Sequence, residues 1–480
     1  MYLLAIDQST QGTKALLLDD SGEIVCRADR KHQQLISSEG WVSHDLEEIY
    51  ENVCKVVRDV VIAAEVSPEE IVAVGITNQR ETTAAWDTNG TPLGKAIVWQ
   101  CARAKSITDG LKMRAPEIFE KTGVPLSPYF SAAKMAWILQ NGTRNRSIHL
   151  GTIDSYLVYR LTEGNFVTDY SNAARTQLFN LHTLQWDEEI CAWFGIPIHA
   201  LPQVQDSNAC YGYTDFQGFL PKAIPILAVL GDSNGALFGQ GCLERGQTKV
   251  TYGTGSSIMM NIGPDIKFSS HGLATSLAWR ISGETSYVLE GNVNYTGAII
   301  SWLQNDLGMI SSVAEVETAL SCANPDDTSY LVPAFSGLSA PYWDNNARAI
   351  LCGMSRTTGK PEIIKAAVES IAYQINDVLQ ALQGDSGYSI RELRADGGAS
   401  RNAYLMQFQS DISQVELFPA AQEELSAIGV AYLAGISAGV YSMERVLHKK
   451  NAAFYRPQIS DALRNTKCAG WHEAIKKATA

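Results

Sequence analysis

The sequence lacks the features that mark membrane-bound, disulfide-stabilised and nucleic-acid-binding proteins. No apolar run among its 480 residues approaches the roughly 18 that a membrane-spanning helix needs, and no basic leader precedes the first apolar segment. The nine cysteines include no C-x-x-C pair, and their odd number argues against a disulfide framework or a zinc site. The net charge of −13 comes without a basic block, which disfavours binding to nucleic-acid phosphates. We therefore expect a cytoplasmic protein with neither membrane nor nucleic-acid partners.

Common nucleotide-binding and metal-binding motifs are also missing. The chain has no G-x-x-x-x-G-K-[ST] phosphate loop and no dinucleotide-type G-x-G-x-x-G. Its eight histidines show no metal-ligand spacing. These absences disfavour P-loop, Rossmann-type and histidine–metal proteins.

The composition is that of a globular protein with more than one domain. Apolar residues make up 45% of the chain and charged residues 19%, and the length is about three times that of a typical domain. A helical pattern at 47–64 precedes a predicted buried strand at 71–76, and such alternation indicates an α/β fold. We place a domain boundary near 243–247, which divides 1–244 from 245–480 and leaves a cleft between the halves.

The second half carries the pattern of a long helix and a short strand. The helix is predicted to begin at Pro361, a favoured first-turn residue, and to end at Gly384. A strand at 393–395 leads into DGGAS at 396–400, where adjacent glycines either let a ligand approach the backbone or form an ordinary turn. A final helix of small residues is predicted over 427–438.

A pair of similar polar hairpins is present, one in each half. DQSTQGTK at 7–14 lies between two apolar segments, and TYGTGSS at 251–257 is flanked in the same way. Turns rich in glycine, serine and threonine direct several N–H groups and hydroxyls at one point, which suits phosphate. The repetition predicts a duplicated protein that clamps a polyphosphate between its halves.

Two carboxylates that end predicted strands are candidates for chemistry. Asp7 could hold Mg²⁺, directly or through water, with Lys14 near enough to reach a terminal phosphate. Asp232 follows an apolar strand and opens a predicted helix, whose N-terminus favours negative charge, so it is the candidate general base for phosphoryl transfer. A turn-ordering role for Asp7 and a capping role for Asp232 are the simpler alternatives.

Polar residues also follow the predicted strand at 71–76. Ligands of open α/β sheets bind at strand carboxyl ends, and Arg80 and Glu81 would supply a donor and an acceptor for neighbouring hydroxyls. Trp99 could form an apolar wall and Tyr129 could add a hydroxyl contact. A solvated loop and ordinary core positions are the alternatives.

Taken together and in this order, these segments resemble the FGGY family of carbohydrate kinases. The resemblance covers nearly the whole chain and rests on ITNQRETT, AIVWQC, SPYFSAAK, TDYSNAARTQLFNLHTLQWD, ALFGQ, TYGTG, VPAFSGLSAPYWD, ESIAYQ, DGGA and GVAYLAG. It implies two ribonuclease-H-like domains of the actin-like ATPase type, with a catalytic cleft between them. It also implies ATP-dependent phosphorylation of a terminal hydroxyl of a small polyol or sugar.

The resemblance assigns roles to individual residues. The polyol would be held by Arg80, Glu81, Trp99, Tyr129 and Ser233, with Asp232 as the general base. The phosphates and nucleotide would contact Thr10, Gln11, Gly12, Lys14, Thr254, Gly297, Ser301, Gly398 and Asn402. Mg²⁺ would be held by Asp7 and Asp232. Gly297 and Asn402 come from the resemblance alone, and a homodimer or a homotetramer is a further expectation.

Within the family the motifs are closest to those of glycerol kinases, with departures from their usual residues. Ser233 stands where they usually have Gln, Ser257 where they have Phe, Ser301 where they have Gln, and Lys14 where they have Arg. Loss of a Phe and a Gln side chain should enlarge the pocket and make it more polar. The alternative acceptor is therefore a larger tetritol, pentitol or ketopentose.

Two interpretations of another kind stay open. The hairpins alone fit an ATP-driven clamp that transfers no phosphoryl group, as in chaperone ATPases and filament proteins. Arg80, Glu81, Trp99 and Asp232 favour a kinase, because a clamp needs no polyol pocket. Retention of Asp7 and Asp232 argues against a non-catalytic sugar sensor.

Overall fold

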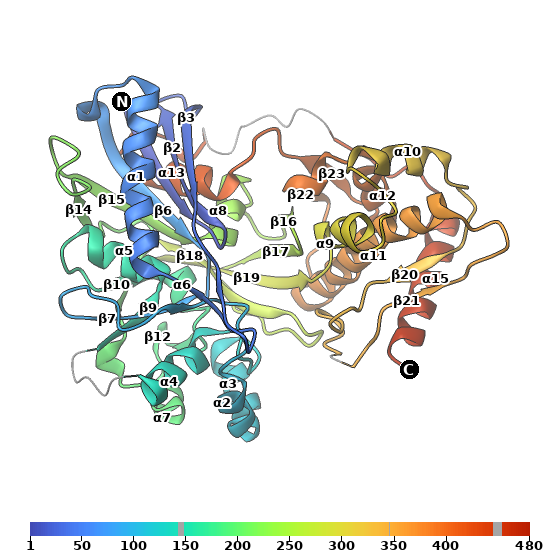
Figure 1. Ribbon diagram of the computed structural model, residues 1–480, viewed down its shortest axis with the longest axis horizontal. Coiled ribbons are helices and arrows are strands. Elements are labelled where there is room, and N and C mark those ends of the chain that lie inside the picture. Colours follow the sequence, from blue (N-terminus) through green and yellow to red (C-terminus); the bar gives the residue numbers. More distant parts are fainter. Residues whose placement is uncertain (143–147, 345, 445–453) are drawn as a thin grey trace.

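The computed structural model contains two α/β units that lie side by side (Figure 1). It describes residues 1–142, 148–344, 346–444 and 454–480. We call the six-stranded sheet of the N-terminal half, with the elements around it, the first unit. The six-stranded sheet of the C-terminal half and its surroundings are the second unit. The predicted two-domain α/β fold is confirmed.

The sheet of the first unit is buried on both faces. Its order is β14-β15-β6-β1-β2-β3, with β1 (Tyr2–Gln8), β2 (Gly12–Asp19), β3 (Ile24–Lys31), β6 (Ile71–Asn78), β14 (Gly212–Thr214) and β15 (Ile224–Gly231). Strands β1, β6 and β15 are parallel, and β2 is antiparallel to β1. Leu4 and Ile6 pack with α1 (Leu46–Ala64), whereas Leu3 and Ala5 belong to the core on the other face. Burial of both faces explains why these strands are continuous apolar runs.

The second unit repeats this plan. Its sheet has the order β18-β19-β17-β16-β22-β23, with β16 (Thr248–Tyr252), β17 (Ser256–Gly263), β18 (Ala274–Ile281), β19 (Glu284–Val293), β22 (Glu392–Asp396) and β23 (Glu416–Pro419). Strand β16 is antiparallel to β17 and parallel to β22. In the same way, β1 is antiparallel to β2 and parallel to β6. Helices α11 (Lys360–Ser386) and α12 (Ala403–Ser413) pack on one face. The duplication predicted from the two hairpins is thus present in the strand pairing.

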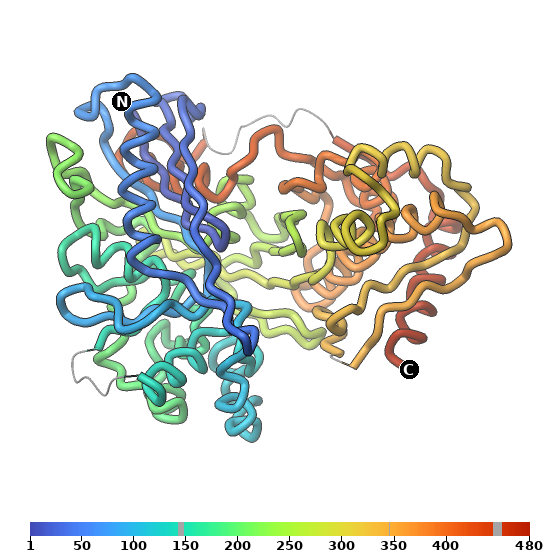
Figure 2. The backbone as a smooth tube through the Cα atoms, viewed as in Figure 1, coloured from blue at the N-terminus to red at the C-terminus, as the bar shows by residue number. Residues whose placement is uncertain are grey.

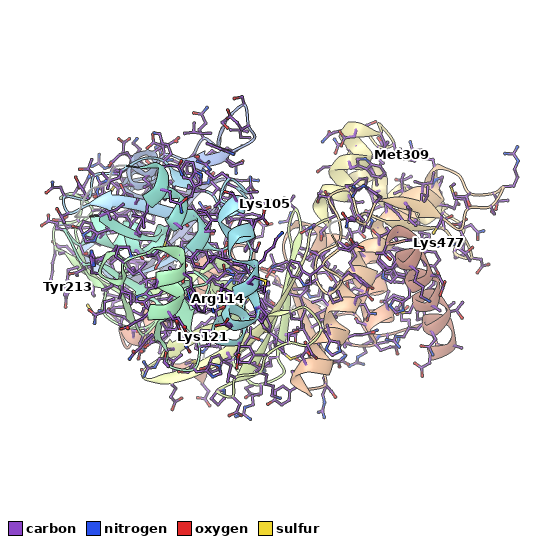
Figure 3. The ribbon with its side chains drawn as sticks, turned by 90° about the horizontal axis from the view of Figure 1, so that it is seen from below. Lys105, Arg114, Lys121, Tyr213, Met309 and Lys477 are labelled. Carbon is purple, nitrogen blue, oxygen red and sulfur yellow. The ribbon has the colours of Figure 1, made fainter. Side chains whose placement is uncertain are left out.

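Smaller elements complete both units. A five-stranded sheet of the first unit contains β4 (Leu35–Ile36), β5 (Val42–His44), β7 (Thr83–Asp87), β8 (Ala96–Ile97) and β9 (Ile148–Thr152). The first unit also contains α2 (Lys105–Gly110), α3 (Ala115–Thr122), α4 (Ser131–Asn141), α5 (Ile153–Leu161), α6 (Tyr170–Ala173) and α7 (Glu188–Phe194), and the second unit adds α9 (Gly297–Ser301), α10 (Ala314–Cys322) and α15 (Asp461–Ala478). Figure 3 shows Lys105, Arg114 and Lys121 on the first unit, and Met309 and Lys477 on the second. None of the helices in the described ranges has the length and apolarity needed to cross a bilayer.

Helix boundaries agree with the sequence predictions except at one end. Helix α1 begins where Asp45 caps it, its side chain accepting from the N–H of Glu47. Helix α11 runs past Gly384, so the predicted stop there is wrong. The helix closes at Gly387, whose φ of 73° is the left-handed conformation that ends helices, whereas Gly384 keeps a helical backbone.

One helix of the C-terminal half packs on the first unit. Helix α13 (Leu425–Ser437) lies against β1, β6 and α8 (Asp232–Gly239), and Figure 2 shows this orange-red segment among the blue and green chain of the first unit. Leu230 of β15, Leu433 of α13 and Trp279 of β18 share one apolar core. The two units are therefore joined by a common core as well as by the chain.

Helices α8 and α13 approach so closely that only glycine fits at their contact. A Cβ atom on Gly429 would lie 1.9 Å from the carbonyl oxygen of Gly235, and one on Gly239 would lie 2.4 Å from that of Leu425. Both distances are far below van der Waals contact, so any side chain there would force the helices apart.

We expect Gly429→Ala to lower the free energy of unfolding by about 1–3 kcal/mol, because its methyl group overpacks the contact between α8 and α13. Urea or thermal unfolding measures the change. Gly110→Ala on α2 is the matched control, since a Cβ there meets nothing within 4 Å. An equal loss of stability in both variants would contradict the close approach.

Candidate functional site

The carboxyl ends of the parallel strands in the first unit meet at one edge of the sheet. The register places Thr77 beside both Asp7 and Leu230. The segment after β6, which carries Arg80, and the start of α8 at Asp232 therefore leave the sheet side by side. Such edges are where open α/β sheets bind ligands.

A cavity of about 660 Å³ lies at this edge, between the two units. The first unit lines it with Ser9, Thr10, Gln11, Gln34, Arg80, Glu81, Trp99, Gln100, Tyr129, Asp232 and Ser233. The second unit lines it with Thr251, Gly253, Thr254, Gly255, Ser256, Ser257, Asn292, Val293 and Asn294. The polyol residues predicted from the sequence, Asp232 and parts of both hairpins thus come together.

The other predicted residues do not form this wall. They are Asp7, Gly12, Lys14, Gly297, Ser301, Gly398 and Asn402. Lys14 extends to the second unit's Glu424, with 2.6 Å between its Nζ and Oε2 of the carboxylate. Ser301 is exposed at the end of α9, and the side chain of Asn402 caps α12 by accepting from the N–H of Leu405.

Two of these residues lie directly beside the second hairpin. The N–H of Gly297 donates to the carbonyl of Gly253 at 2.9 Å, which holds the start of α9 against the hairpin. Gly397, with a φ of 89°, packs on Tyr252, where a Cβ would lie 2.4 Å from the carbonyl oxygen. A Cβ on the adjacent Gly398 would meet nothing within 4 Å, so the DGGAS turn leaves open space next to the hairpin.

Asp7 combines burial with an unpaired acceptor. Its Oδ1 is buried and has no hydrogen-bond partner among the described residues. Burial raises the pKa of Asp7 to about 7. The negative charge of Asp232 also raises this pKa, whereas the positive charge of Lys14 lowers it. Within the described part of the chain no group of three or more His, Cys, Asp or Glu side chains could hold a metal. The arrangement suits Mg²⁺, which often binds one or two carboxylates together with phosphates and water.

Asp232 reaches the cavity from the first residue of α8. Its Oδ1 accepts from the N–H of Ser233 at 2.6 Å and lies 3.6 Å from Nε of Arg80. The segment at 77–83 is buried, with no residue more than 5% exposed. The solvated loop that was the alternative for this segment is therefore wrong.

A buried ionic cluster underlies the cavity. Arg80 donates through both terminal nitrogens to Glu290, at 2.9 and 2.6 Å, and Arg175 donates to Glu81 at 2.5 Å. Arg175 also lies 3.2 Å from Glu290. Burial favours protonation of Glu290, but Arg175 and Arg80 outweigh it and hold the pKa of that carboxyl well below its usual range. The cluster therefore contains two positive and two negative side chains.

Backbone strain and aromatic packing shape the side of the cavity that is predicted from the sequence to bind the polyol. Glu81 has a φ of 61°, which is uncommon for a residue other than glycine and is found where the surroundings impose it, often at functional sites. The rings of Trp99 and Tyr129 meet edge to face with centroids 5.5 Å apart, and Trp99 Nε1 donates to Oγ1 of Thr10 at 2.9 Å. Trp99 thus connects Tyr129 with the first hairpin.

A buried lysine holds the loop that carries Tyr129. Lys134 Nζ donates to the carbonyls of Pro128 and Phe130 at 2.8 and 3.2 Å, and also to that of Tyr129. Burial lowers the pKa of Lys134 to about 7, with Glu81 opposing the shift. These contacts fix the backbone from which the Tyr129 ring projects.

Sequence reasoning missed Arg175, Lys134 and Glu290 as parts of this site. Arg175 and Lys134 lie inside segments that were recognised, but their side chains carried no local signal of a role. Glu290 had one signal, because it is a charged residue within the apolar segment YVLEGNV. A charged residue in a buried strand requires a partner, although the sequence does not identify which one.

Two histidines are buried behind the first hairpin. His32 and His44 meet edge to face with ring centroids 4.5 Å apart, and no hydrogen-bond partner is found for any of their ring nitrogens among the described residues. The N–H of His32 donates to Gln11 of the hairpin at 3.3 Å. Burial, reinforced by His32, lowers the pKa of His44 to about 4. Burial also lowers the pKa of His32, with Glu48 opposing it.

We expect His44 to contribute a loss of stability as the pH drops from about 6.5 to about 4, because the unfolded chain protonates His44 before the folded chain does. The loss should approach about 1.4 kcal/mol per pH unit for one such group. Thermal unfolding of wild type and His44→Phe at pH 7, 6 and 5 measures it, and the variant should show the shallower dependence. His199→Gln, at an exposed histidine, is the control. Identical pH slopes in wild type and His44→Phe would refute the effect.

The fold is duplicated, and its polar cavity lies between two hairpins of the kind predicted to bind phosphate. These features are typical of two-domain ATP-dependent kinases with actin-like architecture. The FGGY family of carbohydrate kinases matches in both of its domain models, the N-terminal domain over residues 2–239 and the C-terminal domain over residues 248–438. The chain belongs to this family.

Relatives and solved structures agree with this membership. Glycerol kinase 1 of Thermotoga maritima is 46% identical over 490 residues, which cover 99% of each chain. The crystal structure of Plasmodium falciparum glycerol kinase with ADP is similar with a TM-score of 0.94 and 32% identity, covering 100% of this chain and 98% of that one. A xylulose kinase of Lactobacillus acidophilus shares the fold, with a TM-score of 0.88 at 22% identity over 99% and 96% of the two chains.

The protein is an ATP-dependent kinase, and its acceptor is a hydroxyl of a small polyol or sugar. The expected family and reaction type are thus confirmed, which leaves the clamp without phosphoryl transfer unsupported.

Proposed function

We propose that the cavity holds a small polyol between Asp232 and the terminal phosphate of ATP, enclosed by domains 1–244 and 245–480. The observation that carries this proposal is that Asp232 lines one cavity together with the polar residues after β6 and with both hairpins. A base, an acceptor site and a phosphate site are the parts that phosphoryl transfer needs within reach of each other.

Each side of the cavity has its own proposed task. Arg80, Glu81 and Ser233 would bind the hydroxyls of the polyol, and the rings of Trp99 and Tyr129 would cover its carbon chain. The phosphates and nucleotide would lie against residues of both units: Thr10, Gln11, Gly12, Lys14, Thr254, Gly297, Ser301, Gly398 and Asn402. Lys14 has three N–H donors, of which one is used by Glu424, so the others are available for a phosphate.

Magnesium is the metal that fits, with Asp7 and Asp232 as its protein ligands, directly or through water. The buried Oδ1 of Asp7 supports this assignment, because it has no hydrogen-bond partner in the described part of the chain and such a carboxylate oxygen is a suitable ligand for a cation. When bound, the ion would offset the charge on the phosphates.

In the proposed step, the carboxylate of Asp232 accepts the proton of a terminal hydroxyl while that oxygen bonds to the γ-phosphorus. The bond from the γ-phosphorus to the bridging oxygen breaks, and ADP leaves with that electron pair. The contact with the N–H of Ser233 at the start of α8 keeps the carboxylate aimed at the cavity. Exclusion of water by the two units would limit transfer of the phosphoryl group to water.

We expect Asp232→Asn to lower kcat by about 10²- to 10⁴-fold, because the amide cannot accept the proton. An ADP-release assay at saturating ATP and polyol measures the change. Asp109→Asn, at a carboxylate on the surface of α2, is the control and should keep wild-type activity. A loss of only a few-fold in Asp232→Asn would refute its role as the base.

The identity of the acceptor is the second part of the proposal. The names of the relatives support glycerol. The cavity wall favours a longer polyol as a second candidate, because Ser233, Ser257, Asn292 and Asn294 add small or polar side chains to it. Glycerol has too few hydroxyls to use all of these groups, whereas a four- or five-carbon polyol could reach more of them.

If the longer polyol is the acceptor, a tetritol or pentitol gives a higher kcat/KM than glycerol in a panel of polyols and ketopentoses. Ser257→Phe should reverse this order, because the ring fills the space that the longer acceptor needs. One such change in pocket shape should alter the ratio of the two kcat/KM values, for the longer polyol and for glycerol, by about 10-fold or more. The longer-polyol candidate fails if glycerol gives the highest kcat/KM in the wild-type protein.

A further inference from the structure

Glu290 is the only member of the buried ionic cluster that belongs to the second unit. Arg80, Glu81 and Arg175 come from the first unit, whereas Glu290 lies on β19, whose place between the units is visible in Figure 1. Its side chain is fully buried, and so are those of the two arginines, at 5% and 2% exposure. The two units are therefore connected by ion pairs between buried charged side chains.

The contact between Glu290 and Arg80 determines how the guanidinium is oriented. Both oxygens of the carboxylate accept from the two terminal nitrogens of Arg80, at 2.6 and 2.9 Å. A two-point contact of this kind fixes the plane of the guanidinium group. The remaining edge of the group, at Nε, lies 3.6 Å from Oδ1 of Asp232. Nη1 of Arg80 also donates to Oδ1 of Asn234 on α8, at the longer distance of 3.4 Å. Glu290 accepts the two shorter hydrogen bonds and so sets which edge of Arg80 is left toward Asp232 and the cavity.

Glu290 is also connected to the second hairpin. Strand β19 pairs with β17, with Glu290 opposite Met259 and Asn292 opposite Ser257. The Ser257 hydroxyl lies 3.5 Å from Oε1 of Glu290. The hairpin proposed to contact phosphate and the carboxylate that orients Arg80 are therefore on neighbouring strands.

We propose that Glu290 is a positioning residue for the acceptor, which orients Arg80 from the second unit so that the polyol site is complete only while the two units are docked. The inference rests on the proposed contact between Arg80 and the polyol. It predicts that Glu290 controls the affinity for the acceptor without touching it.

The test compares Glu290→Gln with Glu290→Asp, Arg80→Lys and the double variant Glu290→Gln/Arg80→Lys. With glycerol as the polyol, the KM for the polyol, the KM for ATP and kcat are measured for each variant, and thermal unfolding records stability. We expect Glu290→Gln to raise the polyol KM by about 10²-fold, the size of effect that a misplaced group causes, with a much smaller change in KM for ATP. Because Glu290 acts through Arg80, the double variant should have nearly the polyol KM of Arg80→Lys alone.

Glu369→Gln is the matched control. Glu369 is a buried glutamate on α11, outside the cavity, and accepts from the hydroxyl of Tyr404 at 2.6 Å. Its replacement should lower stability and leave the polyol KM unchanged. An equal rise of the polyol KM in Glu369→Gln would show a general effect of lost stability and overturn the inference.

Glu290→Asp keeps the charge of the cluster and is the variant to measure if Glu290→Gln does not fold. It withdraws the carboxylate by one methylene group, so the polyol KM should still rise while kcat is largely kept. A wild-type polyol KM in Glu290→Asp and in any folded Glu290→Gln overturns the role of Glu290. If Arg80→Lys itself leaves the polyol KM unchanged, the proposed contact of Arg80 with the acceptor fails, and the inference about Glu290 fails with it.

Discussion

The close contact between α8 and α13 is the constraint on which the rest of the structure depends. Gly235, Gly239 and Gly429 let the two backbones approach to distances that exclude any side chain. This contact lies in the core that both sheets share, so it sets how one sheet is placed relative to the other. Asp232 is the first residue of α8, and Glu424 directly precedes α13. The helix contact thus places the acidic groups as well as the sheets.

The charges around the cavity follow from that placement. Arg80 and Arg175 are balanced by Glu81 and Glu290, which makes the burial of four charged side chains tolerable. Asp232 accepts from the N–H of Ser233 and faces the remaining edge of Arg80, and no group among the described residues donates a hydrogen bond to the buried Oδ1 of Asp7. The site therefore presents two carboxylates that are not fully neutralised by the protein. Such a pair is suited to a cation that arrives with the phosphates and to a proton from the acceptor.

Much of the fold and part of the site were predictable from local pattern. The apolar runs before Asp7 and Asp232 identified strands, and the polar residues that follow the strand at 71–76 identified the edge where the cavity lies. The same reasoning failed at Gly384, because a glycine in a helical pattern does not reveal which backbone conformation it adopts. It also missed Arg175, whose carboxylate partners come close only after folding, and Lys134, whose burial against the carbonyls of the preceding loop carries no local signal.

The sequence by itself determined the two hairpins, the α/β pattern and the resemblance to carbohydrate kinases, because each depends on residues that are neighbours in the chain. Only the tertiary structure decided which charges meet. Arg80 and Glu290 are 210 positions apart, and Lys14 and Glu424 are 410 apart. Their pairing depends on how two sheets dock through glycine contacts. Docking is a property of the whole packed core, and no single segment encodes it.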